Sequence, residues 1–116
     1  MRPKHIYETA LFCSRGARPI LQLKNDLFSA PIARKTEDHI SAKPTEMLEY
    51  FLSMVVSEYT VFLDPTCGSG TSVRAAAKLG ALSALGIELN PEIASMAAAK
   101  LQFFLRRQKT EAPDDL

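Results

Sequence analysis

The 116-residue chain lacks the features that define several classes of protein. Two cysteines, Cys13 and Cys67, are too few for a disulfide scaffold, so we expect reduced thiols in a cytoplasmic protein. The longest apolar runs fall far short of a membrane span, and no signal-peptide pattern is seen where residues 1–4 lead into mixed polar sequence. A net charge of +1 favours no particular partner. What remains is a single small globular domain.

Charge is distributed less evenly than the total suggests. Residues 1–35 hold seven Lys and Arg against two acidic residues, a pattern that fits either a nucleic-acid contact or an ordinary solvated surface. His5 and His39 have no carboxylate or cysteine cluster around them in the sequence, so no metal site is predicted.

The first third of the chain predicts a β-hairpin followed by a loop. Residues 6–12 alternate imperfectly and contain β-branched and aromatic residues, and Arg15-Gly16 supplies a turn signal. Residues 19–23 provide the second short strand. Residues 24–42 have no clear period and contain Pro31, which predicts a loop.

The rest of the chain alternates helices with short apolar strands. Helices are predicted over residues 44–56, 71–79 and 90–107, and strands over residues 60–63 and 84–87. The first strand is apolar on both faces, which is typical of an interior parallel strand. Strand, crossover helix and strand form a right-handed parallel unit, so the predicted fold class is α/β.

A glycine loop, Asp64–Gly70, joins the first of these strands to the helix after it. Gly68 and Gly70 let the backbone turn tightly and approach a ligand, and Glu88 falls at the tip of the neighbouring strand, where a carboxylate can bind ribose hydroxyls. Val73 breaks the dinucleotide fingerprint, and no Gly-Lys-Ser/Thr phosphate loop follows. The pattern fits a nucleoside without pyrophosphate, such as S-adenosylmethionine; the alternative is a tight turn with no ligand.

Three segments together resemble the C-terminal part of amino-group DNA methyltransferases, which methylate N6 of adenine or N4 of cytosine. They are HISAKPTEMLEYFLSM (39–54), LDPTCGSGTSVRAAAKLGA (63–81) and LGIELNPEIASMAAAKL (85–101), in the family's order and with its spacing. IYETALFCSRG (6–16) more loosely resembles a strand that precedes the target-recognition region. The resemblance implies a partial Rossmann-like fold with an incomplete sheet, S-adenosylmethionine as cofactor and DNA as substrate.

The resemblance also assigns residues to the S-adenosylmethionine site. Glu88 would bind the ribose, Lys43 and Pro44 would flank the methionine portion, and Asn90 would shape the rim. The glycine loop would line the rest of the site through Asp64, Pro65, Cys67, Gly68, Ser69 and Gly70. In domain terms, residues 1–36 would be a hairpin and loop remnant, residues 37–107 the cofactor-binding unit and residues 108–116 a flexible tail.

The catalytic Asp/Asn/Ser-Pro-Pro-Tyr/Phe loop of this family has no counterpart, because the sequence contains no Pro-Pro. We therefore assign no catalytic residue and expect the downstream half of a methyltransferase. Its central strand would expose an apolar edge, which favours pairing with a complementary catalytic half or a second copy. The alternatives are an inactive remnant that keeps cofactor affinity and an interaction module with an empty pocket.

Overall fold

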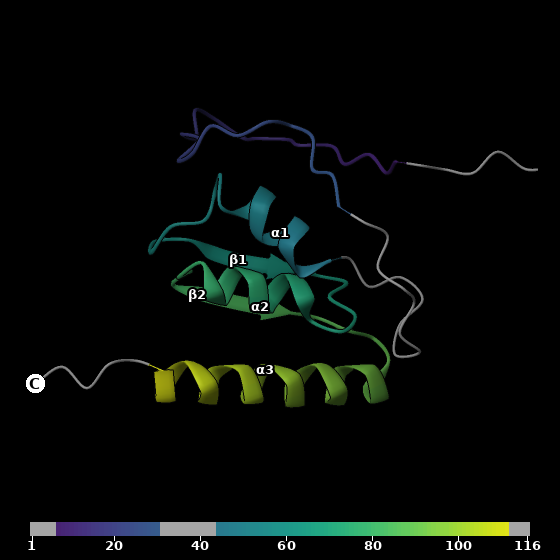
Figure 1. Ribbon diagram of the computed structural model, residues 1–116. Coiled ribbons are helices and arrows are strands. Elements are labelled where there is room, and N and C mark those ends of the chain that lie inside the picture. The colour runs from purple at the N-terminus through teal and green to yellow at the C-terminus, as the bar shows by residue number, and fades with distance from the viewer. Residues whose placement is uncertain (1–6, 31–43, 112–116) are drawn as a thin grey trace, which may run out of the picture.

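The computed structural model describes residues 7–30 and 44–111 (Figure 1). Helix α1 covers Thr45–Leu52, strand β1 Val61–Asp64, helix α2 Thr71–Lys78, strand β2 Ser83–Gly86 and helix α3 Pro91–Glu111. The two strands are parallel, with Val61 opposite Ser83 and Asp64 opposite Gly86. The predicted α/β fold with parallel strands and a crossover helix is therefore confirmed, in a partial, Rossmann-like form with an open sheet.

Helix α2 covers one face of this sheet. Its Val73, Ala75 and Ala76 are buried, the two alanines completely. Phe62 of β1 and Ala84 of β2, which are register partners, are half-buried on the side facing α2. Alanine has the highest helix propensity and a side chain of one carbon, so this helix can form readily and lie close to the strands.

The opposite face of the sheet is apolar and exposed. Val61 and Leu63 of β1 are 72% and 56% exposed, and Leu85 of β2 and Ile87 just after it are 59% and 51% exposed. The expectation that β1 is buried on both faces is therefore wrong for this chain by itself. The physical reason is that, in the described part of the chain, α2 is the helix packed on both strands, and it covers only the other face. Among the described residues β1 also has only one neighbour, so its outer edge is free, as predicted.

The predicted N-terminal hairpin is wrong, because residues 7–30 contain no strand. The segment instead lies along α1 and the turn after it: the Leu21 N–H donates to the Met54 carbonyl at 2.7 Å, and Lys24 Nζ donates to Ser53 Oγ at 2.6 Å. The rings of Phe28 and Tyr50 pack 5.3 Å apart. These contacts with α1 take the place of cross-strand pairing. Residue 6 of the predicted hairpin and residues 31–42 of the predicted loop lie outside the described residues.

Helix α3 continues to Glu111, four residues beyond its predicted end near Arg107. Ala97 of this helix is buried, whereas the neighbouring Met96 is 46% exposed. In Figure 1, α3 begins on the side to which both strand arrows point and runs back along the molecule. No helix in the described ranges is long and apolar enough to cross a membrane.

Candidate cofactor site

The loop between β1 and α2 depends on two glycines with left-handed backbone conformations. Gly68 has φ of 51° and Gly70 has φ of 77°, and Gly70 is the N-cap of α2. Other residues adopt this conformation only at an energetic cost, which explains glycine at both positions. The Gly70 N–H donates to the Cys67 carbonyl at 2.8 Å and closes the turn.

Glu88 spans the gap between the two strand ends. Its Oε2 accepts the Gly68 N–H at 3.0 Å, and its Oε1 accepts the Asn90 N–H at 3.0 Å. Two backbone bonds extend the ladder beyond the strands: Cys67 N–H to the Ile87 carbonyl, and Ile87 N–H to the Asp64 carbonyl, both at 2.9 Å. The predicted proximity of Glu88 and Gly68 across adjoining strand tips is thus confirmed.

The residues at this edge of the sheet fit a nucleoside. A Cβ built on Gly68 would meet no atom within 4 Å, so open space lies directly beside the loop backbone. An ionised carboxylate has about four acceptor positions, and Glu88 uses two of them on backbone donors. It retains acceptor capacity for a pair of adjacent hydroxyl groups. The arrangement could therefore hold a ribose against a glycine loop.

Both carboxylate oxygens of Asp64 accept hydrogen bonds from within the loop and from α2. Its Oδ1 accepts the Thr66 N–H at 3.0 Å, and its Oδ2 accepts a hydrogen bond from the Ser72 hydroxyl on α2. The carboxylate therefore braces the turn and connects β1 to the first turn of α2. Sequence reasoning selected Asp64 for the cofactor and did not find Ser72; the structure gives both a positioning role.

Asn90 is also structural in its immediate contacts. Its Oδ1 accepts the N–H groups of Glu92 at 2.9 Å and Ile93 at 3.2 Å, which are donors left unpaired at the start of α3. Because the Asn90 N–H also donates to Glu88, this cap fixes the start of α3 relative to the carboxylate. The rim of the site and the start of α3 are therefore held together by the same residue, Asn90.

The remaining predicted site residues do not all lie in the glycine loop. Pro65 is exposed in the turn after β1, and Ser69 Oγ lies 3.1 Å from Thr71 Oγ1. Pro44 is the N-cap of α1, and its carbonyl accepts the Leu48 N–H at 3.3 Å. Lys43 lies outside the described residues.

Gly86 was missed by sequence reasoning, although it determines how the loop packs. A Cβ at this position would lie 2.6 Å from Cys67 Sγ and 2.8 Å from Val73 Cγ2. Only glycine lets the loop and α2 approach β2 this closely. A glycine inside a predicted strand is a known sign of close approach, so the signal was present.

Arg74 is a second missed residue. Its guanidinium donates to the Ser69 carbonyl at 2.8 Å and to Thr71 Oγ1 at 3.3 Å, so it stabilises the loop from α2. Burial lowers the pKa of Arg74 from its ordinary value. No sequence motif marks such a brace, because the pairing depends on how the loop folds back over the helix.

Cys67 is a packed, poorly ionised thiol. Burial raises its pKa, and the nearby carboxylates of Asp64 and Glu88 raise it further. A raised pKa lowers the thiolate fraction at any pH below it, and the thiolate is the reactive form. Its sulfur lies against the backbone at Gly86, as expected for a packing residue.

Because its pKa is raised and its thiol is less exposed, we expect iodoacetamide at pH 8 to alkylate Cys67 more slowly than the exposed Cys13. The difference should shrink as pH rises above the pKa of Cys67. Glu88→Gln removes one of the negative charges and should speed alkylation of Cys67 alone. Peptide mass spectrometry over time measures both rates, and equal rates at the two cysteines would contradict this account of the site.

Comparison with known families agrees with the fold. The family model for DNA methylase, of the N6/N4 group, matches residues 4–99, which is most of the chain. The chain belongs to the DNA methylase family. No curated protein and no solved structure gave a match.

Proposed function

We propose that this chain is the S-adenosylmethionine-binding part of a DNA methyltransferase that modifies an exocyclic amino group, N6 of adenine or N4 of cytosine. The observation that carries the proposal is the Glu88 carboxylate bonded to the Gly68 amide at the carboxyl ends of two parallel strands. Ligands of open α/β sheets bind at these ends. Membership of the DNA methylase family supplies the reaction class and the DNA substrate.

In this proposal each residue has a binding or positioning task. Glu88 accepts the ribose hydroxyls, and the backbone of Gly68, Ser69 and Gly70 lies against the nucleoside. Asp64, Pro65 and Cys67 shape the loop, and Asn90 holds the rim, while Lys43 and Pro44 flank the methionine portion. Bound S-adenosylmethionine supplies the methyl group; the chain orients that group and provides no catalytic residue.

We further propose that the catalytic loop comes from a polypeptide segment outside these 116 residues. Two observations support a missing neighbour: among the residues that the structure describes, β1 has a free edge, and the uncovered side of the sheet carries Val61, Leu63, Leu85 and Ile87. Parallel sheets normally have both faces covered. A segment that adds a strand beside β1 and covers this face would also bring its own residues next to the strand tips.

A methyl-transfer assay tests this directly. With labelled S-adenosylmethionine and DNA, we expect no transfer by the chain alone and transfer when a polypeptide with a Pro-Pro-aromatic loop and complementary strands is added. Leu63→Lys combined with Leu85→Lys should abolish the restored activity because it charges the docking face, yet leave cofactor binding intact. Leu105→Lys, a similar change on α3, is the matched control.

The outcomes separate the alternatives. Cofactor binding without restored methyl transfer would favour a catalytically inactive remnant. Failure to bind S-adenosylmethionine in calorimetry would overturn the cofactor assignment and leave an interaction module with this fold.

A further inference from the structure

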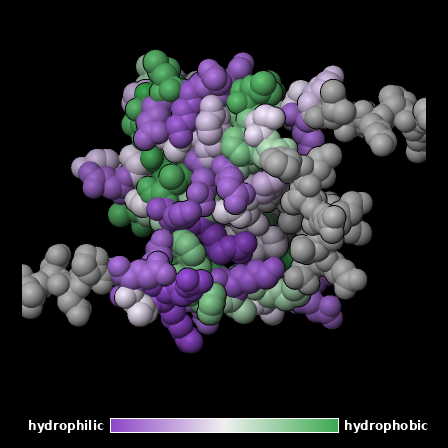
Figure 2. Space-filling model, viewed as in Figure 1, coloured by the Kyte–Doolittle hydropathy of each residue, from purple (hydrophilic) through white to green (hydrophobic). Residues whose placement is uncertain are grey.

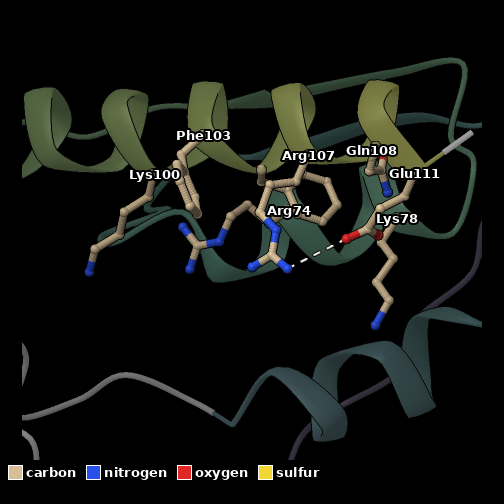
Figure 3. A pocket seen from close by; sticks show the side chains of 8 residues that line it. Arg74, Lys78, Lys100, Phe103, Arg107, Gln108 and Glu111 are labelled. Carbon is tan, nitrogen blue, oxygen red and sulfur yellow. Dashed lines mark hydrogen bonds and ion pairs between the residues drawn. The ribbon is translucent and has the colours of Figure 1, made fainter.

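A groove separates α2 from the C-terminal half of α3, away from the glycine loop (Figure 3). Its volume is about 560 Å³. The residues that line this α2–α3 groove are Arg74, Lys78, Lys100, Phe103, Phe104, Arg107, Gln108 and Glu111. None of them belongs to the proposed cofactor contacts, although Arg74 braces the loop from behind.

The groove carries an excess of positive charge. It contains four cationic side chains and one carboxylate, that of Glu111, which lies 3.4 Å from Arg107. Lys78 is paired with Glu49 of α1 at 2.9 Å. Arg74 bonds only neutral oxygens, and Lys100 has no carboxylate partner within the described part of the chain. Two positive charges are therefore left uncompensated along the groove.

The same groove is also apolar in part. Phe103 is 64% exposed and Phe104 is half-buried. Beyond Lys100 the described part of α3 contains no buried residue, and only Leu101 and Phe104 are half-buried, so this half of the helix is only partly covered. Figure 2 shows that the α3 side of the molecule is otherwise largely hydrophilic in this view. Aromatic rings among cations are typical of protein-binding grooves.

We propose that the α2–α3 groove binds an acidic amphipathic helix of a partner protein. Apolar side chains of that helix would cover Phe103 and Phe104, and its carboxylates would pair with Lys100 and Arg74. Charge complementarity selects an acidic ligand. Double-stranded DNA fits less well, because its sugar–phosphate backbone offers no apolar surface to cover the exposed Phe103 ring.

The position of the groove supports a protein partner too. The cofactor loop lies where the strands end, whereas α3 runs from there toward the other end of the sheet (Figure 1). Lys78 is the last residue of α2, and Glu111 is the last residue of α3. A helix bound between them would leave the cofactor edge itself uncovered, and Lys100, which has no contact with the loop, separates this contact from the proposed methyl transfer.

The test uses the whole chain and a fluorescent helical peptide with leucine on one face and glutamate on the other. We expect fluorescence anisotropy to show binding at low salt that weakens as salt rises. Lys100→Glu and Phe103→Ser should each weaken binding roughly tenfold or more, about 1.4 kcal/mol. Lys109→Glu makes the same charge change on α3 outside the groove lining and should have little effect.

Three results would overturn the proposal. They are no peptide binding, equal effects of Lys100→Glu and Lys109→Glu, and tighter binding of a DNA duplex with the same dependence on Lys100. Calorimetry with S-adenosylmethionine on the same variants distinguishes the two proposals, since Lys100→Glu should leave cofactor affinity unchanged. Circular dichroism confirms that each variant is folded.

Discussion

Glu88→Ala is expected to weaken S-adenosylmethionine binding by about 100-fold or more. A hydrogen bond to a charged group contributes about 1.5–3 kcal/mol, and the proposal gives Glu88 two such bonds to the ribose. A factor of ten in affinity corresponds to about 1.4 kcal/mol, so two lost bonds exceed two factors of ten. The variant also loses the acceptor for the Gly68 amide, which adds to the effect.

Isothermal calorimetry measures this change, with Glu92→Ala as the control. Glu92 is an exposed acid in the first turn of α3, close in sequence but without a side-chain contact to the loop. A cofactor analogue that lacks both ribose hydroxyls separates direct recognition from loop disruption. It should bind the parent chain weakly and should lose little further affinity in Glu88→Ala. Undiminished binding of S-adenosylmethionine by Glu88→Ala would refute the ribose assignment.

Gly86→Ala is expected to destabilise the fold by about 1–3 kcal/mol, the usual cost of overfilling a packed interior. The added methyl group would lie 2.6 Å from Cys67 Sγ and 2.8 Å from Cys67 Cβ, and Val73 Cγ2 is also 2.8 Å away. Either the glycine loop or α2 must move away from β2 to admit it. Cofactor affinity should therefore fall together with stability, since the loop is part of the proposed site.

Urea denaturation of the matched variants measures the free energy of unfolding. Ser83→Ala lies at the exposed start of the same strand and should change stability by less than about 0.5 kcal/mol. Cys67→Gly removes two of the three close atoms. In the Cys67→Gly background, Gly86→Ala should therefore lower the free energy of unfolding by less than it does in the parent chain. If Gly86→Ala is as stable as the parent chain, the close packing of loop and strand is wrong.

The elements that local sequence patterns define strongly were the ones predicted well. The strands at 60–63 and 84–87 were placed within one residue of Val61–Asp64 and Ser83–Gly86, because short apolar runs end at clear glycine and acid signals. The proximity of Glu88 to Gly68 followed from parallel topology alone. Both features are fixed by the chain between residues 60 and 90.

The predictions that were wrong or missing concern which parts of the chain pack against one another. Residues 7–23 carry strand-forming side chains, but the Leu21 N–H donates to the Met54 carbonyl in the turn after α1 and not to a neighbouring strand. Strand propensity is realised only where a neighbouring strand exists. The roles of Gly86 and Arg74 likewise depend on approach distances, which no residue pattern specifies.

The buried interior consists of Val56, Val73, Ala75, Ala76 and Ala97, and no large side chain in the described ranges is fully buried. Heat capacity rises on unfolding in proportion to the apolar surface that becomes hydrated, so the isolated chain should show a small increment and a broad melting transition. A partner segment that covers Val61, Leu63, Leu85 and Ile87 would bury further apolar surface, in addition to that of the core. Binding of a segment that completes the sheet should therefore give a negative heat-capacity change. Calorimetry at several temperatures would measure it, even if the enthalpy of binding is close to zero at one of them.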